Sequence, residues 1–304
     1  MHSHRGKKAK VLTAEQLTDT CSDEKRPRLV KCRVIEQFAP YANIRRLTLA
    51  AEEIAISCSP GQFVYVLCNA HSQSYDPLLR RPFSIHFADP QAGTIVILYE
   101  IRGRGTQILS TKQEGDQVDI IGPLGRGFQI PESHDGEFWL VGGGIGVAPL
   151  YFLLRSLQSK YGRECIRFLV GARTCDSVLC RHEFAAHCSQ LFVSTDDGSE
   201  GYAGFVTALT EECLSREASL RNPIIYACGP MPMLKEVAAI SRRWNLQCQV
   251  SLETKMACGL GACMGCAVKL RACEEPGASD DSNFKYALSC VEGPVFSADE
   301  IIWE

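Results

Sequence analysis

The first half of the chain alternates short runs of branched and aromatic residues with clusters of Gly, Pro and Asp. Six runs stand out between Leu29 and Gly127, at 29–38, 44–51, 61–68, 81–88, 94–102 and 117–124. Almost no helical periodicity separates them, and this spacing is typical of an antiparallel barrel or sandwich. The pattern therefore predicts a β-barrel.

The pattern changes near Glu137. A short apolar run at 137–141 leads into a glycine-rich loop and then into an amphipathic stretch at 151–162. Strand-like and helical stretches then alternate, at 166–172, 190–197, 204–217, 223–229 and 231–244. Strand, glycine loop, helix and strand in this order indicate a parallel sheet with right-handed crossovers.

These patterns divide the 304 residues into four predicted parts. Residues 1–28 are rich in Lys and Arg and have little hydrophobic periodicity, so we expect a flexible extension. Residues 29–131 form the β-barrel domain and residues 132–250 the α/β domain. Residues 251–304 are too few for a full domain and form a short C-terminal module.

Composition and charge narrow the function classes. Hydrophobic residues make up 45% and charged residues 22%, which excludes wholesale disorder. A formal net charge of -3 gives no electrostatic case for nucleic acid as a partner. No run reaches the ~18 apolar residues of a membrane span, and the basic N-terminus has no apolar segment of a secretory signal behind it. We expect a cytoplasmic protein that binds neither nucleic acid nor a membrane.

The chain has sixteen cysteines, most of which read as small buried hydrophobic residues. Cys258, Cys263 and Cys266 differ, because they form C-x4-C-x2-C, the spacing of plant-type [2Fe–2S] loops. Gly259, Gly261 and Gly265 would allow the positive φ angles that such a loop needs. Structural zinc is disfavoured, since no second C-x2-C pair and no His follow.

The fourth cluster ligand is either Cys273 or Cys290. Cys273 lies in a polar segment that reads as a loop, whereas Cys290 lies in an apolar context. We favour Cys290.

The run Arg80–Ser84, with the sequence R-R-P-F-S, carries a possible flavin site. A lone Arg and Ser on a strand usually lie at the surface, but an Arg can also pair with a phosphate and a hydroxyl can bond to the flavin N5 edge. Gly103–Thr106 (G-R-G-T) opens a short helical stretch. It reads either as a plain turn or as a pyrophosphate site.

Gly142–Pro149 has the sequence G-G-G-I-G-V-A-P and lies between a strand and a helix, as a dinucleotide pyrophosphate site should. Pro149 replaces the usual third glycine, and no acidic residue ends the next strand cleanly, which disfavours an ordinary Rossmann dehydrogenase. Cys228 begins C-G-P-M, where Gly229 would let a nicotinamide approach. The alternative for Cys228 is a buried structural cysteine.

The order R-P-F-S, G-G-G-I-G-V-A-P and C-G-P-M-P-M resembles the ferredoxin–NADP reductase superfamily over residues 29–250. With the cysteine loop and S-C-V-E-G-P-V-F, the chain resembles the electron-transfer subunits of NAD-linked dihydroorotate dehydrogenases. The resemblance implies a ferredoxin reductase-like fold with one FAD, one [2Fe–2S] cluster and NAD as electron acceptor. The residues implied are Arg81, Pro82, Phe83, Ser84, Leu98, Tyr99, Glu100, Gly105 and Thr106 for FAD, Gly142, Gly143, Gly144, Gly146, Cys228, Gly229 and Pro230 for NAD, and Cys258, Cys263, Cys266 and Cys290 for the cluster.

Two positions bear on cofactor binding. Glu100 stands where an Arg is usual in the family, so one contact to FAD is lost or is replaced by Arg102 or Arg104. Arg173 lies where it could meet a 2′-phosphate, so the residues leave NAD against NADP open.

The three cofactors would pass electrons in a fixed order. NAD exchanges two electrons, the cluster exchanges one and a flavin can do both, so FAD has to lie between the other two. The resemblance implies an FMN-bearing catalytic partner that oxidises dihydroorotate in pyrimidine biosynthesis, assembled two plus two into a heterotetramer. An alternative is a reductase subunit with the same cofactors that serves a ferredoxin or a hydrogenase. A more remote one is a redox sensor without catalysis.

Overall fold

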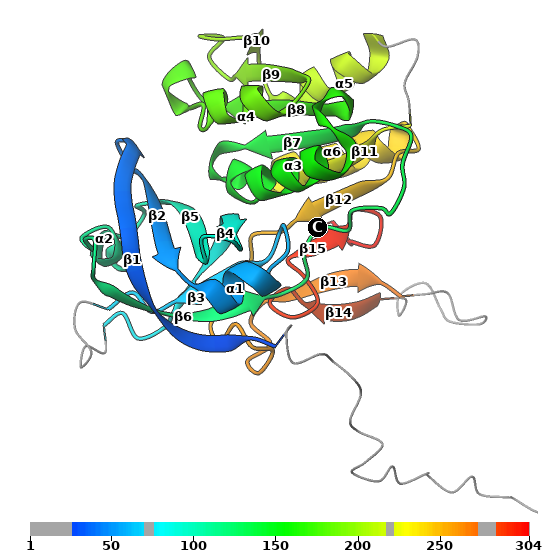
Figure 1. Cartoon of the computed structure of the whole chain (residues 1–304). Coiled ribbons are helices and arrows are strands. Elements are labelled where there is room, and N and C mark those ends of the chain that lie inside the picture. The colour runs from blue at the N-terminus through cyan, green and yellow to red at the C-terminus, as the bar shows by residue number, and fades with distance from the viewer. Residues whose placement is uncertain (1–25, 70–75, 217–221, 273–283, 304) are drawn as a thin grey trace, which may run out of the picture.

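The first half of the chain closes into an antiparallel barrel (Figure 1). The computed structural model describes residues 26–69, 76–216, 222–272 and 284–303. Around the barrel the strands follow the order β1-β2-β5-β4-β3-β6, and β1 closes the circle by pairing with β6. Their bounds are β1 Arg28–Tyr41, β2 Ile44–Ala50, β3 Phe63–Val66, β4 Arg81–Asp89, β5 Thr94–Glu100 and β6 Gln117–Leu124.

The barrel interior follows from the alternation along its strands. Val34, Leu47 and Leu49 are buried there, whereas their neighbours in sequence are partly or fully exposed. Two short helices, α1 (Glu52–Ser57) and α2 (Arg104–Leu109), follow β2 and β5.

The second half forms a seven-stranded sheet in the order β10-β9-β8-β7-β11-β12-β15. All neighbours are parallel except β15, which runs antiparallel to β12. The strands are β7 Phe138–Gly143, β8 Ile166–Ala172, β9 Gln190–Thr195, β10 Tyr202–Ala203, β11 Ile224–Cys228, β12 Cys248–Ser251 and β15 Val295–Ser297.

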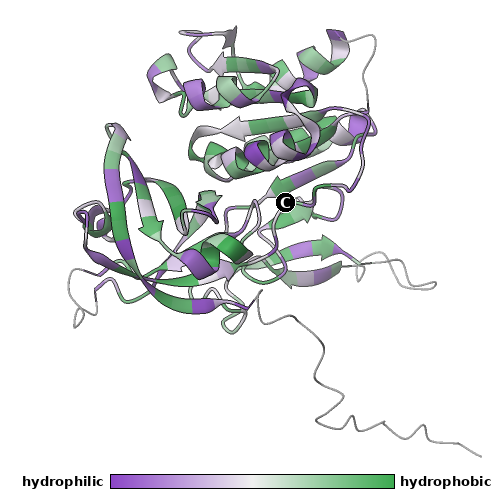
Figure 2. Cartoon of the chain, in the orientation of Figure 1, coloured by the Kyte–Doolittle hydropathy of each residue, from purple (hydrophilic) through white to green (hydrophobic). Residues whose placement is uncertain are grey.

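Helices cover both faces of this sheet. α3 (Val147–Tyr161) and α4 (Arg181–His187) share one core cluster, and α5 (Val206–Arg216) and α6 (Met231–Arg243) share the other. The strands of the sheet are largely hydrophobic in Figure 2, whereas the helices mix the two colours, as expected for one buried and one solvated face. None of the described helices combines the length and the apolar character needed to span a membrane.

The C-terminal segment adds the hairpin β13 (Ala267–Arg271) and β14 (Phe284–Leu288), which lies beside the barrel in Figure 1. The chain then returns to the large sheet as β15.

The predicted fold class is confirmed: a barrel precedes an α/β domain, and the predicted strands match observed ones. The predicted domain boundaries stay predictions, and the one at residue 250 falls inside β12. Sequence patterns missed β10, β12 and β15, because two to four residues show too little periodicity. They also missed β13 and β14, which have five residues each. Residues 1–25, most of the predicted flexible extension, lie outside the described part, as does Cys273.

Candidate functional site

The β13–β14 hairpin brings two of the predicted cluster cysteines together. Cys266 directly precedes β13, and one residue separates the end of β14 from Cys290. Ala267 pairs with Leu288 at this end of the hairpin. The backbone N–H of Cys290 accordingly points at the Cys266 Sγ, 3.4 Å away. Both side chains are buried. Cys290 therefore meets the predicted loop although 23 residues separate it from Cys266.

Backbone donors also point at the other two thiols. The N–H groups of Leu260 and Cys263 lie 3.4 Å from the Cys258 Sγ, and that of Gly265 lies 3.5 Å from the Cys263 Sγ. The first two hydrogen bonds lower the pKa of Cys258 to about 6. Burial, in contrast, raises the pKa of the Cys290 thiol to about 12. The four thiols, with no histidine among them, form a donor set that fits iron and sulfide.

The loop turns through left-handed backbone conformations, as predicted, but not at all of the predicted residues. Gly259 and Gly261 have φ angles of 71° and 82°. Gly265 does not adopt a positive φ. Met264, at 61°, takes the turn instead. The expectation for Gly265 was wrong, because the sequence marks where such a φ is easy rather than where the fold requires it.

The cysteine loop packs on the barrel strand β3. The Tyr65 hydroxyl donates a hydrogen bond to the Met256 carbonyl oxygen at 3.0 Å. A Cβ at Gly259 would lie only 2.8 Å from the Tyr65 ring. Tyr65 in turn pairs with Pro82 on β4, so the loop lies one strand away from R-P-F-S.

The two predicted flavin-phosphate segments meet in space. A Cβ at Gly105 would lie 3.6 Å from the Arg81 Nε, which places the Arg81 side chain against the start of α2. Arg80 instead pairs with Asp119 across the barrel at 2.6 Å. Within the described residues, Arg81 forms no ion pair. The Thr106 hydroxyl accepts a backbone hydrogen bond from Gly103 at 3.1 Å. The Arg81 Nη1 donates to the carbonyl oxygens of Leu79 at 2.6 Å and Arg80 at 3.2 Å, which leaves the other N–H groups of this guanidinium for an anionic ligand.

Alternation along β5 separates the three predicted residues there. The Tyr99 side chain lies inside the barrel, where its hydroxyl donates to the Gln37 Oε1 at 2.8 Å and burial raises its pKa. It therefore faces away from the barrel surface, and only its backbone remains for a ligand. Leu98 is buried in the core between the barrel and α3. Glu100 accepts hydrogen bonds from Asn43 at 2.9 Å and Arg102 at 2.5 Å.

A cavity of about 880 Å³ lies between the barrel and the carboxyl ends of the sheet strands. The turn between β1 and β2 forms one wall, and Gly143, Gly144 and Pro230 lie on the other. Gly144 has a φ of 54°, and a Cβ there would meet nothing within 4 Å, so its backbone faces open space. Such a cleft is where open α/β sheets bind nucleotides.

The remaining predicted glycines hold loops together and do not line the cavity. A Cβ at Gly146 would lie 2.6 Å from the Gly229 Cα, so the two loops touch through their backbones. A Cβ at Gly142 would lie 2.7 Å from Val147 at the start of α3. Their role is close packing behind the cavity wall.

Cys228 is buried, with 3% exposure, and does not line the cavity. Burial first, and the nearby Glu253 second, raise the pKa of its thiol to about 12. A contact with nicotinamide stays a prediction, and the thiol is neutral in any such contact.

The cavity also contains residues that the sequence pattern did not single out. Asp196 follows β9 and Glu253 follows β12, and both line the cavity together with Arg173, which was predicted there. No acidic residue ends β8 cleanly, whereas Asp196 directly follows the neighbouring strand β9. The Asp196 N–H donates a hydrogen bond to the Ala172 carbonyl oxygen at 3.0 Å. A carboxylate here is suited to ribose hydroxyl groups.

Two family models match the chain. The iron–sulfur cluster binding domain of dihydroorotate dehydrogenase B matches residues 253–302, and the oxidoreductase NAD-binding domain matches residues 140–239. The first match spans the cysteine loop and the hairpin.

Full-length relatives are similar along most of the chain. The electron transfer subunit of dihydroorotate dehydrogenase B (NAD(+)) from Desulforamulus reducens is 36% identical, over 90% of this chain and 97% of the relative. The subunit of the same name from Geobacillus kaustophilus is 43% identical, over 84% and 91%. A solved NADH-dependent reduced ferredoxin–NADP oxidoreductase, studied for flavin-based electron bifurcation, matches at a TM-score of 0.75 and 26% identity over 90% of each chain.

Proposed function

The chain belongs to the family of electron transfer subunits of dihydroorotate dehydrogenase B (NAD(+)), and from this premise we propose which residues hold its cofactors and how they divide the work. As a member, it is an oxidoreductase subunit that transfers electrons and works with a catalytic partner subunit. In the proposed assignment FAD, one [2Fe–2S] cluster and NAD bind to this chain. Bound together, a cluster moves single electrons, a flavin converts between one and two, and a nicotinamide takes a hydride.

Four cysteines are proposed to hold the cluster: Cys258, Cys263, Cys266 and Cys290. The fit is supported by the thiol-only donor set, by the N–H groups directed at the sulfur atoms of the first three, and by the hairpin that brings Cys290 to Cys266. The N–H groups of Leu260 and Cys263 favour the thiolate form of Cys258, which is the form that binds iron. Cys273 remains the alternative fourth ligand, outside the described residues.

The barrel surface around β4 is proposed to bind FAD. Arg81 and the backbone at Gly105 form the phosphate contact, since Arg81 is without an ion pair among the described residues and lies against Gly105. Pro82, Phe83 and Ser84 follow on the same strand, and each is partly exposed. Further proposed contacts come from Leu98, Tyr99 through its backbone, Glu100 and Thr106.

The 880 Å³ cavity is proposed to bind NAD. Gly143, Gly144 and Pro230 present backbone to it, while Gly142, Gly146, Cys228 and Gly229 support that wall from behind. Asp196 favours NAD over NADP, because a carboxylate accepts hydrogen bonds from ribose hydroxyls and repels a 2′-phosphate. Arg173 in the same cavity limits that repulsion.

One observation carries the proposed order of electron transfer: the cysteine loop rests on Tyr65 of β3, next to Pro82 of β4. The segment assigned to the cluster and the segment assigned to FAD thus share neighbouring strands. The barrel holds the two segments at a fixed separation, since both are anchored in paired backbone.

The partner is proposed to dock around the cysteine loop. Leu260 and Met264 on this loop are 53% and 57% exposed, and Val291 beside Cys290 is also exposed. Exposed apolar side chains around Cys263 suit a protein interface. That the partner carries FMN, and that two copies of each chain assemble, rest on the family resemblance alone. We also propose a cytoplasmic location, which the free thiols of the described cysteines support.

The test measures which reactions the isolated chain catalyses and which reactions need the partner subunit. The isolated chain should reduce ferricyanide with NADH and be inert towards dihydroorotate. Adding the FMN-bearing partner should give dihydroorotate-dependent NAD reduction. A cluster-free variant should lose that coupling and keep most of its NADH-to-dye activity. Turnover of dihydroorotate by this chain alone would contradict the proposal, and reduction of ferredoxin in preference to the partner would favour the reductase alternative.

A further inference from the structure

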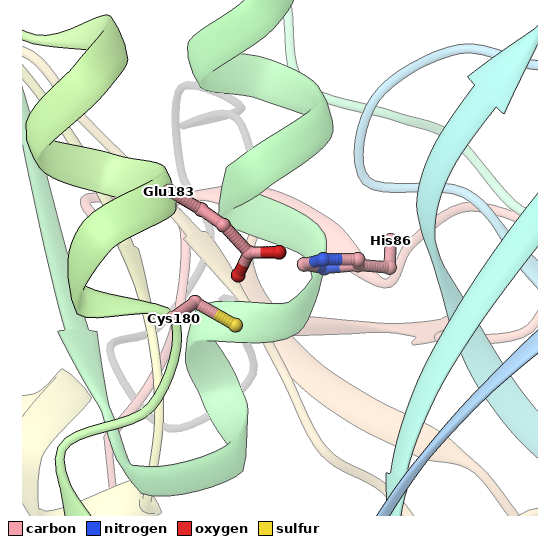
Figure 3. Close-up of side chains that lie close together, drawn as sticks. All are labelled: His86, Cys180 and Glu183. Carbon is pink, nitrogen blue, oxygen red and sulfur yellow. The ribbon is translucent and has the colours of Figure 1, made fainter. Parts of the chain in front are cut away.

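A second group of metal-ligating side chains lies between the barrel and the α/β domain, away from the cysteine loop. His86 comes from β4, and Cys180 and Glu183 come from the start of α4 (Figure 3). One potential ligand atom from each lies within 4.8 Å of the other two. Figure 3 shows the Glu183 carboxylate and the Cys180 thiol on the same side of the His86 ring.

The hydrogen bond at the far side of the His86 ring fixes its tautomer. The His86 Nδ1 lies 2.8 Å from the Ala148 carbonyl oxygen. A carbonyl oxygen can only accept, so Nδ1 carries the proton and Nε2 presents a bare lone pair. An imidazole held by Nδ1–H to a carbonyl is the usual arrangement of a metal-binding histidine. Tyr151 stacks on the ring at 4.8 Å and holds its plane.

The His86 Nε2 is completely buried and has no hydrogen-bond partner among the described residues. Leaving such an acceptor without a partner costs roughly 1–3 kcal/mol. Nearby polar groups do not relieve this cost, because the Glu183 carboxylate only accepts hydrogen bonds and the Cys180 thiol donates its hydrogen bond to Glu183. Glu183 also pairs with Arg46 at 2.5 Å. The bare Nε2 lone pair can therefore accept a hydrogen bond or bind a metal ion.

We propose that His86, Cys180 and Glu183 bind a Zn²⁺ ion that joins the barrel to the α/β domain. An imidazole nitrogen, a thiolate and a carboxylate oxygen are the ligand types that zinc accepts, whereas magnesium and calcium need oxygen ligands. In a tetrahedral zinc site the ligand atoms lie about 3.5 Å apart, so the present group has to contract by roughly 1 Å.

Zinc binding releases one proton. The Cys180 thiol releases its proton to solvent, and the thiolate and the Glu183 carboxylate offset the two charges of the ion. Arg46 keeps its place on the other Glu183 oxygen. The Glu183 side chain is 34% exposed, so an ion can enter from that side.

The site would act on the wall of the nucleotide cavity. The Cys180 N–H donates to the Tyr41 hydroxyl at 3.1 Å, and that hydroxyl donates to the Val178 carbonyl oxygen at 3.3 Å. Tyr41 and Leu179 line the cavity. Zinc at this place holds the wall in position without touching a reacting group.

The test compares metal content in the flavin- and iron-loaded protein after exposure to Zn²⁺ and gel filtration. The wild type should retain about one zinc per chain in addition to its iron. The zinc content of the Cys180→Ser and Glu183→Gln variants should be at least tenfold lower than that of the wild type, with iron and flavin content unchanged. The matched control is Cys188→Ser, a buried cysteine just after α4 that lies outside the group.

X-ray absorption at the zinc edge identifies the ligands in the wild type, whether or not the variants fold. One sulfur at about 2.3 Å with nitrogen and oxygen neighbours is the expected shell. A four-sulfur shell would assign the zinc to the cluster cysteines and overturn the proposal. The proposal would also be overturned if the wild type retained no zinc, or if both variants retained as much zinc as the wild type.

Discussion

The Tyr65 hydroxyl donates a hydrogen bond to the Met256 carbonyl oxygen at 3.0 Å, across 191 positions of sequence. This hydrogen bond holds the cysteine loop against strand β3 of the barrel. Gly259 packs on the same ring. The contact is so close that no side chain at position 259 would fit between the backbone and the ring. The cluster segment is thus held by barrel packing as well as by its own turns.

Gly259→Ala should therefore lose the cluster. Its φ of 71° disfavours alanine, and the added Cβ would lie 2.8 Å from the Tyr65 ring. Gly115→Ala is the matched control, because its φ of 89° carries similar strain while its Cβ would meet nothing within 4 Å. Iron analysis and visible absorption should report severalfold less cluster in the first variant and a normal content in the second. Equal iron in both would show that the ring contact is unimportant.

The fourth cluster ligand can be decided by a pair of serine variants. Cys290→Ser should lose the iron, about two atoms per chain in the loaded protein, because the Cys290 thiol is the one brought to Cys266. Cys273→Ser should retain it. The reverse result would make Cys273 the ligand. Both are read from iron content and the visible spectrum.

Arg81→Ala should weaken flavin binding at least about tenfold, since a charge-assisted hydrogen bond contributes roughly 1.5–3 kcal/mol. Arg80→Ala is the neighbouring control. Arg80 is paired with Asp119, so its loss should lower Tm and leave flavin affinity nearly unchanged. Flavin titration followed by fluorescence measures both. If Arg81→Ala bound flavin as tightly as the wild type, strand β4 would not form the phosphate site.

Gly144→Ala should raise the KM for NADH about tenfold, because one added methyl group in a binding pocket costs roughly 1–3 kcal/mol. Its Cβ would project into the open cavity. Gly162→Ala provides the comparison, with a φ of 83°, free space around the Cβ and a place at the end of α3, outside the cavity. Steady-state NADH oxidation with a dye should separate the two. A KM that rises equally in both would point to strain instead of a nucleotide contact.

Cys228 should behave as a neutral thiol up to high pH. Burial raises its pKa to about 12 from 9.0, so unfolding releases its proton above pH 9. The thiol's contribution to stability is complete below pH 9 and is lost as pH rises toward 12, by about 1.4 kcal/mol per pH unit at most. Tm should therefore fall less steeply above pH 9 in Cys228→Ala than in the wild type.

The same burial predicts slow alkylation. At pH 8 iodoacetamide should modify the exposed Cys175 and leave Cys228 intact, as read by mass spectrometry. Rapid modification of Cys228 would place it at an accessible surface of the cavity, with an ordinary thiol pKa.

The sequence alone determined the order of the two folds and the identity of the cysteine loop. Alternation in 29–38 or 117–124 is a local property with period two, so β1 and β6 could be found without knowing their partners. The spacing of Cys258, Cys263 and Cys266 is equally local, since three ligands from one short loop must follow each other closely.

Only the tertiary structure decided which distant residues share a site. Cys290 joins Cys266 through the pairing of β13 with β14, and Asp196 enters the cavity because β9 lies beside β8. Gly146 and Gly229, from two distant motifs, pack against each other, and the neighbouring Cys228 is buried and does not line the cavity. The physical reason is that strand order, register and side-chain direction depend on contacts between segments far apart in the chain, and no local period encodes them.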